Sequence, residues 1–165
     1  MPNVYLAHME LGDRTGHEAG RRLLLQLYEA HAGGVMPPIA IAPGGKPCFA
    51  EGNWHFSISH TKHHAFCALS DVPIGIDAEE IDRKIDLRLA EKILSPAEKA
   101  QFDAADDKRL TLLTFWVLKE AAAKLTGQGL RGYPNHTNFT LPDSRVTQID
   151  GCLVAIICEE NNYVI

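Results

Sequence analysis

The chain has 165 residues, of which 45% are apolar and 22% charged, and its formal net charge is −5. This length suits one compact unit that buries a core without disulfides or metals, and the composition excludes a disordered tail or a collagen-like chain. No apolar run reaches the roughly 20 residues that span a bilayer, no secretory signal opens the sequence, and the acidic balance is unlike that of nucleic-acid binders. We therefore expect a cytoplasmic protein.

Hydrophobic patterning predicts an α+β fold built from two similar halves, residues 1–72 and 73–165. The first half contains a strand, a helix and three strands: Val4–Met9, Thr15–His31, Ile39–Ile41, Trp54–Ser59 and Ala65–Leu69. The second contains a strand, two helices and three strands: Ile74–Asp77, Ser95–Phe102, Lys108–Thr126, Phe139–Leu141, Val146–Ile149 and Leu153–Cys158. The order β-α-β-β-β occurs twice, with extra helical material in the second copy. This repetition favours two similar halves with a cleft between them.

Capping residues mark both helices of the second half. Ser95 suits an N-cap, Pro96 the first helical position, and Glu98 can reach back to the cap. The longer helix is expected to end before Gly127 and Gly129, which suit a left-handed C-terminal cap. The run Gly44-Gly45-Lys46-Pro47 predicts a tight turn.

Two carboxylates define the first candidate site. Asp77 and Glu79 alternate along a strand, so they share one face and lie about 7 Å apart. Like charges this close raise each other's pKa unless something positive lies between them, and a cation is the simplest such partner. The alternative is a strand that runs into a solvated acidic loop, since Glu80 and Asp82 follow.

The long predicted helix carries the second candidate site. Leu113, Trp116, Val117, Glu120 and Lys124 share one helical face, so a carboxylate and an ammonium continue an apolar stripe. A helix that enters a cleft would bury its first turns and present Glu120 and Lys124 to a ligand. The alternative is a surface Glu–Lys pair that contributes about 0.2–0.5 kcal/mol.

The third candidate site lies in the first half. In His55–Thr61 the apolar residues alternate inward, so Ser57 and Ser59 face the other way and His60 ends the strand. A lone histidine is more often structural than ligating. Lys46 in its glycine turn could contact a phosphate, but the P-loop pattern and the GxGxxG fingerprint are both absent.

Together these residues form a set suited to a hard cation and a polyphosphate. Mg²⁺ prefers oxygen ligands and shares them between a few carboxylates, water and substrate phosphates. The set contains the carboxylates Asp77, Glu79 and Glu120, the lysines Lys46 and Lys124, and His60 with neighbouring serines.

In three ordered blocks the sequence resembles the 4'-phosphopantetheinyl transferases, in particular the two-lobed surfactin-synthetase-activating type. Gly45-Lys46-Pro47 followed by His55–His60 is similar to the family's GKP…FNISHS block. Ile74–Glu79 is similar to its GIDIE block, and Phe115–Lys124 with Gly127–Leu130 is similar to its W-x-x-KE-A-x-x-K block. The resemblance covers about residues 39–160.

The resemblance implies a pseudo-dimer that moves phosphopantetheine from coenzyme A to a serine of an apo acyl or peptidyl carrier protein and releases adenosine 3',5'-bisphosphate. It implies that Asp77, Glu79 and Glu120 hold Mg²⁺, with Mn²⁺ as a possible substitute. Glu120 or a metal-bound water would take the serine proton, with Lys124 as the second catalytic residue. Coenzyme A would be bound by the following residues: Lys46, Ser59, His60, Lys119, Lys124 and Arg14, with Arg21 or Arg22 as a substitute for Arg14.

Three other interpretations remain at this point. One is a short trimeric carrier-protein synthase, although the full upstream half favours a monomer. Another is a non-catalytic module that binds a carrier protein or coenzyme A, and the third is a metal-dependent phosphohydrolase. The basic stretch Arg83, Lys84 and Arg88 is a candidate docking edge for an acidic carrier.

Overall fold

The computed structural model describes residues 1–127 and 138–159 and combines helices with sheets, in agreement with an α+β fold. The strands are β1 (Val4–Glu10), β2 (Ile39–Ile41), β3 (Pro47–Phe49), β4 (His55–His60), β5 (His64–Ser70), β6 (Ile74–Glu80), β7 (Val146–Ile149) and β8 (Cys152–Cys158). The helices are α1 (Gly16–Leu27), α2 (Ala90–Ile93), α3 (Pro96–Ala104) and α4 (Lys108–Thr126), with a π-helical turn at Tyr28–Ala32 and a 3₁₀ turn at Leu87–Leu89. No helix within these ranges is long and apolar enough to cross a membrane.

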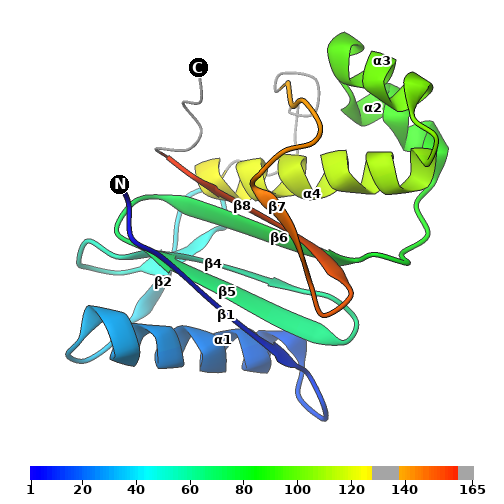
Figure 1. The fold of residues 1–165 in the computed structure, drawn as a ribbon. Helices are drawn as coiled ribbons and strands as arrows, with labels where there is room; N and C mark the ends of the chain where they lie inside the picture. The colour runs from blue at the N-terminus through cyan, green and yellow to red at the C-terminus, as the bar shows by residue number, and fades with distance from the viewer. Residues whose placement is uncertain (128–137, 160–165) are drawn as a thin grey trace.

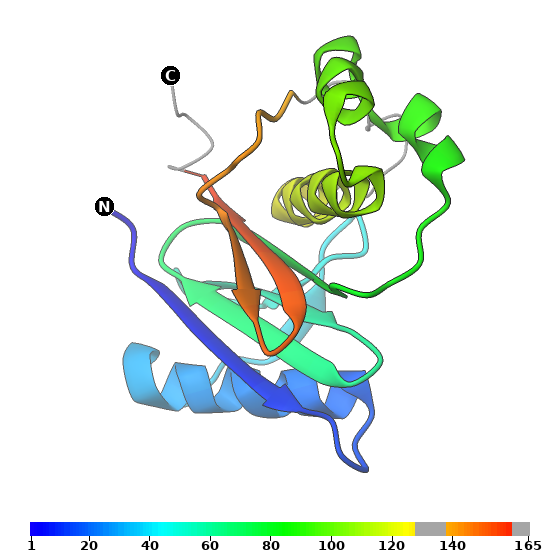
Figure 2. The ribbon, with the colours of Figure 1, turned by 45° about the vertical axis from the view of Figure 1, so that its right-hand side comes forward.

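Four layers make up the molecule (Figures 1 and 2). The N-terminal sheet has the strand order β1-β5-β4, and the C-terminal sheet has the order β6-β8-β7; neighbouring strands in both are antiparallel. Helix α1 covers the outer face of the N-terminal sheet, and α4 covers the outer face of the C-terminal sheet. The short β2–β3 hairpin forms a separate two-stranded sheet.

Strand alternation divides the core between these layers. On β5, Ala65, Cys67 and Leu69 pack toward α1, whereas Phe66 and Ala68 pack between the two sheets. On β8, Leu153, Ala155 and Ile157 pack with α4, whereas Cys152, Val154 and Cys158 lie between the sheets. Both strands are apolar on both faces because each is covered on both sides.

The two sheets meet where β4 runs beside β6. β6 is an edge strand of its own sheet, so every second residue directs its N–H and C=O groups away from β8, where they have no ladder partner. Side chains supply those partners: the Ser57 hydroxyl accepts the N–H of Ile76, and the Ser59 hydroxyl accepts the N–H of Ala78, both at 3.1 Å. The N–H groups at this edge of β6 are thereby hydrogen-bonded without extension of the sheet. We call this contact the β4–β6 seam.

Helix α4 approaches β6 very closely, and Gly75 permits this approach. A Cβ atom at Gly75 would lie 2.0 Å from the carbonyl oxygen of Ala121 and 2.5 Å from the amide nitrogen of Leu125. Such distances are far inside van der Waals contact, so the backbones of α4 and β6 can meet only because position 75 has no side chain.

Most of the predicted elements are confirmed. The predicted helix Lys108–Thr126 matches α4, and Gly127 adopts the left-handed conformation at its C-cap. The capping box predicted for Ser95 and Glu98 is present at α3. Gly129 lies outside the described residues. The sequence did not predict β3, which begins at Pro47 directly after the glycine turn, nor the short turns of Leu87–Ile93.

The predicted strand Phe139–Leu141 is wrong, because this segment is irregular. Its backbone groups are bound by side chains of α3 and not by another strand. Glu98 accepts the N–H of Phe139, while Gln101 donates to the carbonyl of Phe139 and accepts the N–H of Leu141. A segment can therefore have its backbone groups satisfied by side chains of a neighbouring helix without joining a sheet.

Removal of a seam hydroxyl should destabilise the fold. We expect Ser57→Ala to cost about 1–3 kcal/mol, because the buried N–H of Ile76 would lose its acceptor. The exposed Ser144→Ala is the matched control and should change stability by less than about 0.5 kcal/mol. Urea unfolding of both variants measures the difference, and equal midpoints would contradict this account of the seam.

Candidate functional site

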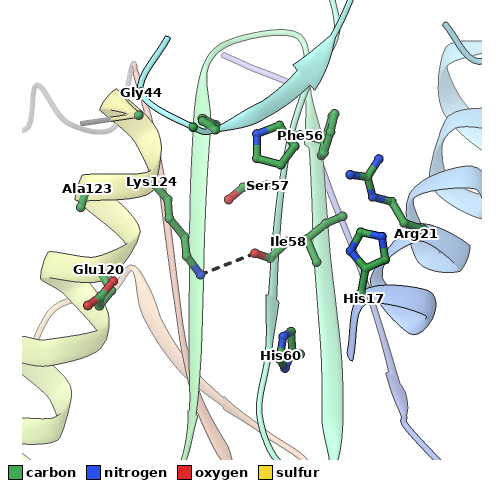
Figure 3. A pocket seen from close by; sticks show the side chains of 14 residues that line it. His17, Arg21, Gly44, Phe56, Ser57, Ile58, His60, Glu120, Ala123 and Lys124 are labelled. Atoms are coloured by element: carbon green, nitrogen blue, oxygen red, sulfur yellow. Dashed lines mark hydrogen bonds between the residues drawn. The ribbon is translucent and has the colours of Figure 1, made fainter. Parts of the chain in front are cut away.

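A pocket of about 380 Å³ opens beside the β4–β6 seam. Its walls come from α1, the turn between β2 and β3, β4, and the C-terminal half of α4 (Figure 3). This volume is within the usual range of small-molecule sites. The ionisable side chains that line it are His17, Arg21, Lys46, His60, Glu120 and Lys124.

The glycine turn positions Lys46 at the end of the pocket nearest the C-terminus of α4. Gly45 has φ +87°, which confirms the predicted tight turn, and its N–H donates to the carbonyl of Ala42. The ammonium of Lys46 donates to the carbonyl of Ile74 on β6 at 2.8 Å. Burial lowers the pKa of Lys46 to about 8. Lys46 is therefore a desolvated cation whose charge is sensitive to pH near neutrality.

Three basic groups meet where β4 crosses α1. His60 ends β4, and its ring packs directly on the first turn of α1, where a Cβ atom at Gly16 would lie 2.2 Å from the ring carbon Cγ. His17 and Arg21 are one helical turn apart on α1 and point into the pocket opposite α4 (Figure 3). The side of the pocket formed by α1 and β4 thus presents a guanidinium and two imidazoles.

Asp77 is the most buried of the three candidate metal ligands, with 6% of its surface exposed. Its Oδ1 atom accepts from Lys124 at 3.0 Å and from the Ser59 hydroxyl at 3.3 Å. Its Oδ2 atom is buried and has no hydrogen-bond partner among the described residues. Burial raises the pKa of Asp77, and the nearby Lys124 opposes this rise. A buried carboxylate oxygen without a donor is a position where a cation would bind favourably.

Glu79 lies two residues further along the same face of β6, as the strand alternation predicted. Its Oε1 atom accepts from the indole Nε1 of Trp116 on α4 at 3.2 Å and forms an ion pair with Arg83. Burial, and then the charge of Asp77, raises the pKa of Glu79.

Glu120 faces the pocket from α4, one turn before Lys124 (Figure 3). Burial raises the pKa of its carboxyl to about 7, and repulsion by Asp77 and Glu79 adds to the rise. Since each of these carboxylates acts on Glu120, the two β6 acids and the α4 acid belong to one electrostatic site.

The donor set fits a hard divalent cation. Three carboxylates repel one another, and Asp77 offers an oxygen without a donor. Oxygen donors of this kind suit Mg²⁺. Within residues 1–127 and 138–159, however, no three histidine, cysteine or acidic side chains already lie close enough to hold a metal ion. Asp77, Glu79 and Glu120 therefore need a local adjustment of side chains to share one ion.

Three residues predicted to bind coenzyme A are not among those that line the pocket. Ser59 is buried, and its hydroxyl bridges Asp77 and the N–H of Ala78. Arg14 is exposed in the turn before α1. Lys119 is only 1% exposed, and its ammonium forms a 2.7 Å ion pair with the fully buried Glu98. The adjacent residues Lys119 and Glu120 thus point into different surroundings.

The sequence did not predict His17, and it proposed Arg21 only as a substitute for Arg14. One sequence feature could have indicated that His17 and Arg21 share a helical face: they are four residues apart on a helix that begins with the Thr15–Glu18 capping box. In the basic stretch predicted as a docking edge, Arg83 and Arg88 form ion pairs with Glu79 and Asp86.

Comparison with known proteins points to one family. The family model described as the 4'-phosphopantetheinyl transferase superfamily matches residues 73–160. The chain is 37% identical over 89 residues to "4'-phosphopantetheinyl transferase psf-1" of Bacillus pumilus, an alignment that covers 52% of this chain and 38% of the relative. It is 35% identical over 134 residues to "4'-phosphopantetheinyl transferase HetI" of Nostoc sp., covering 71% of this chain and 54% of the relative.

A further relative, "4'-phosphopantetheinyl transferase gsp" of Aneurinibacillus migulanus, is 35% identical over 88 residues. That alignment covers 52% of this chain and 36% of the relative. The chain therefore spans well under half the length of psf-1 and gsp and about half the length of HetI.

The desolvated Lys46 gives the pocket a pH dependence. Above pH 8 the free pocket loses the Lys46 proton, so anion binding must take a proton up. We expect the affinity for inorganic pyrophosphate to fall as pH rises above 8, by up to about tenfold per pH unit. Calorimetric titration from pH 7 to 9.5 measures this. Lys46→Met is the control and should bind more weakly without this dependence; an affinity of the unmodified chain that stays constant to pH 9.5 would contradict the assignment.

The buried Lys119–Glu98 pair should matter mainly for stability. We expect Lys119→Met to destabilise the chain by about 3–5 kcal/mol, because Glu98 would keep an uncompensated buried charge. Lys99→Met removes ion pairs with the exposed Asp103 at 2.7 Å and the exposed Glu91 at 3.1 Å and should cost less than about 1 kcal/mol. Urea unfolding compares the two variants, and similar losses would show that burial does not distinguish the pairs.

Proposed function

The chain belongs to the 4'-phosphopantetheinyl transferase superfamily, and on this basis we propose that it transfers 4'-phosphopantetheine from coenzyme A to a serine of an apo acyl or peptidyl carrier protein. The other product is adenosine 3',5'-bisphosphate. The observation that carries the proposal is the pocket at the β4–β6 seam, where Arg21, Lys46 and Lys124 surround a space that Glu120 lines, and Asp77 and Glu79 repel the Glu120 carboxylate. This combination suits a pyrophosphate with a divalent cation.

We further propose that residues 1–72 and 73–165 are the two halves of a pseudo-dimer with the active site in the cleft between them. In support, each half contributes a three-stranded antiparallel sheet with one long helix on its outer face. The pocket receives Lys46 and His60 from the first half and Glu120 and Lys124 from the second. The proposal includes a monomeric protein that works in the cytoplasm.

The basic groups of the pocket would bind the phosphates of coenzyme A. Lys46 and Lys124 lie at the α4 side, and His60 with Arg21 lies at the α1 side, so negative charge can be neutralised from both directions. Ser59 would contribute by fixing Asp77 and β6 through the two hydrogen bonds of its hydroxyl. Lys119 would contribute by holding α4 against Glu98 of α3.

Asp77, Glu79 and Glu120 would hold Mg²⁺, or Mn²⁺ in its place. When bound, the ion would supply positive charge beside the pyrophosphate oxygens. Before it binds, Lys124 compensates Asp77 through a 3.0 Å hydrogen bond. Lys124 can then turn toward a phosphate, since its side chain keeps 32% of its surface exposed.

The transfer itself requires an incoming serine, a proton acceptor and a leaving group. The carrier's serine oxygen would form a bond to the phosphorus that carries the pantetheine. The bond from that phosphorus to the bridging oxygen would break, and adenosine 3',5'-bisphosphate would leave with the bonding electron pair. Glu120 would take the serine proton, because its carboxylate faces the pocket from α4.

Intact-mass analysis of an apo carrier protein tests this function directly. We expect a phosphopantetheine mass gain after incubation with the full chain, coenzyme A and Mg²⁺, and no gain when EDTA is present. Asp77→Ala and Glu120→Ala should each lower the rate by about 10²-fold or more. Glu29→Ala removes an exposed carboxylate outside the pocket and is the matched control.

Two results would contradict the proposal. Retained transfer in both acid variants would show that the assigned site is wrong. No mass gain on any of several carriers, with coenzyme A still bound in calorimetry, would favour the second candidate, a non-catalytic binding module. That candidate is motivated by the fraction of the relatives' length that this chain spans.

A further inference from the structure

Arg83 forms an ion pair with Glu79, one of the three carboxylates of the candidate metal site. It lies in the turn after β6, four residues beyond Glu79, and its Nη1 atom donates to Oε1 of Glu79. The same oxygen accepts the indole N–H of Trp116 at 3.2 Å. The guanidinium of Arg83 also lies over the Trp116 ring, 5.7 Å from its centroid. Arg83, Glu79 and Trp116 thus form one contact group at the rim of the site.

The backbone of Arg83 is fixed, whereas its side chain is accessible. The N–H of Arg83 donates to the carbonyl of Glu80, and Arg109 of α4 donates to the carbonyls of Ile81 and Arg83. The Arg83 side chain is 42% exposed, compared with 20% for Glu79. The guanidinium can therefore leave Glu79 for solvent by side-chain rotation, without unfolding the turn.

The charges of the site explain why the Arg83 guanidinium pairs with Glu79. Asp77, Glu79 and Glu120 are partly or fully buried and repel one another. Lys124 neutralises Asp77 directly, and Arg83 neutralises Glu79. The positive charge of Arg83 lowers the pKa of all three carboxyls, against the opposing effect of burial. In the metal-free chain, Arg83 therefore supplies charge that a divalent cation would otherwise provide.

We propose that Arg83 is a displaceable counter-ion, which holds Glu79 in the metal-free chain and must leave its carboxylate when a divalent cation binds. This inference rests on the proposed function, because it assumes that Glu79 is a metal ligand. It assigns to Arg83 the role of a positioning residue that weakens cation binding, and it makes Trp116 the residue whose surroundings change when the exchange occurs.

The test compares Arg83→Gln with the chain that keeps Arg83, both carrying Trp54→Phe so that Trp116 is the remaining tryptophan of the two. Free Mn²⁺ measured by electron paramagnetic resonance gives the dissociation constant. We expect Arg83→Gln to bind Mn²⁺ about twofold to fivefold more tightly, as loss of a competing partly exposed ion pair implies. Mg²⁺ should change Trp116 emission when Arg83 is present and change it much less in Arg83→Gln.

Arg88→Gln is the matched control, because it removes the same charge from an arginine paired with Asp86 outside the carboxylate set. It should leave Mn²⁺ binding and Trp116 emission unchanged. Asp77→Asn separates the two proposals, because it should abolish Mn²⁺ binding if the metal site is correct. Unchanged or weaker Mn²⁺ binding by Arg83→Gln, with binding still lost in Asp77→Asn, would overturn the role of Arg83 alone. Absence of Mn²⁺ binding to the chain that keeps Arg83 would overturn both.

Discussion

The edge of β6 that no strand pairs with is the constraint on which the architecture depends. Side chains of other segments satisfy this edge: Lys46 binds the carbonyl of Ile74, and Ser57 and Ser59 bind the N–H groups of Ile76 and Ala78. A direct strand ladder would have merged the sheets and left no room for side chains between β4 and β6. The hydroxyl-bridged seam keeps the sheets separate, and the pocket lies beside it.

The seam also determines the chemistry of the pocket. Because Ile76 and Ala78 pack between the sheets, the residues that alternate with them must face α4. Those residues include Asp77 and Glu79, which meet Lys124 and Trp116 of α4. The same alternation that forms the core thus brings acidic residues beneath a helix that carries both a carboxylate and an ammonium. Burial then raises the pKa of each of the three carboxyls.

Sequence patterns were most informative where one hydrophobic period continues over several helical turns or along a whole strand. They predicted the bounds of α4, the shared face of Asp77 and Glu79, and the inward alternation around Phe56. They failed for Phe139–Leu141, because long-range hydrogen bonds from Glu98 and Gln101 replaced a strand partner. Such partners lie about forty residues away along the chain, so the sequence around residues 139–141 does not indicate them.

The candidate site was predictable to the extent that its residues lie on regular elements. Family resemblance alone placed Lys119 with the ligand residues, although the 3.6-residue period puts it on the face of Phe115 and Leu112, which is core. His17 was missed because nothing within α1 indicates that His60 would pack on its first turn. Sites assembled across a seam require the relative placement of elements, which local periodicity does not contain.

The absence of a side chain at Gly75 has a consequence for the spacing of charges. Direct contact between the backbones of β6 and α4 fixes the height of the helix above the sheet at this point. Glu120 lies next to Ala121, one of the two α4 residues that a Cβ atom at position 75 would strike, and Asp77 lies two positions along β6. The spacing of the two backbones that carry the opposing acids is therefore set by a main-chain contact. A position without a side chain thereby determines how far apart the two elements that carry the acids lie.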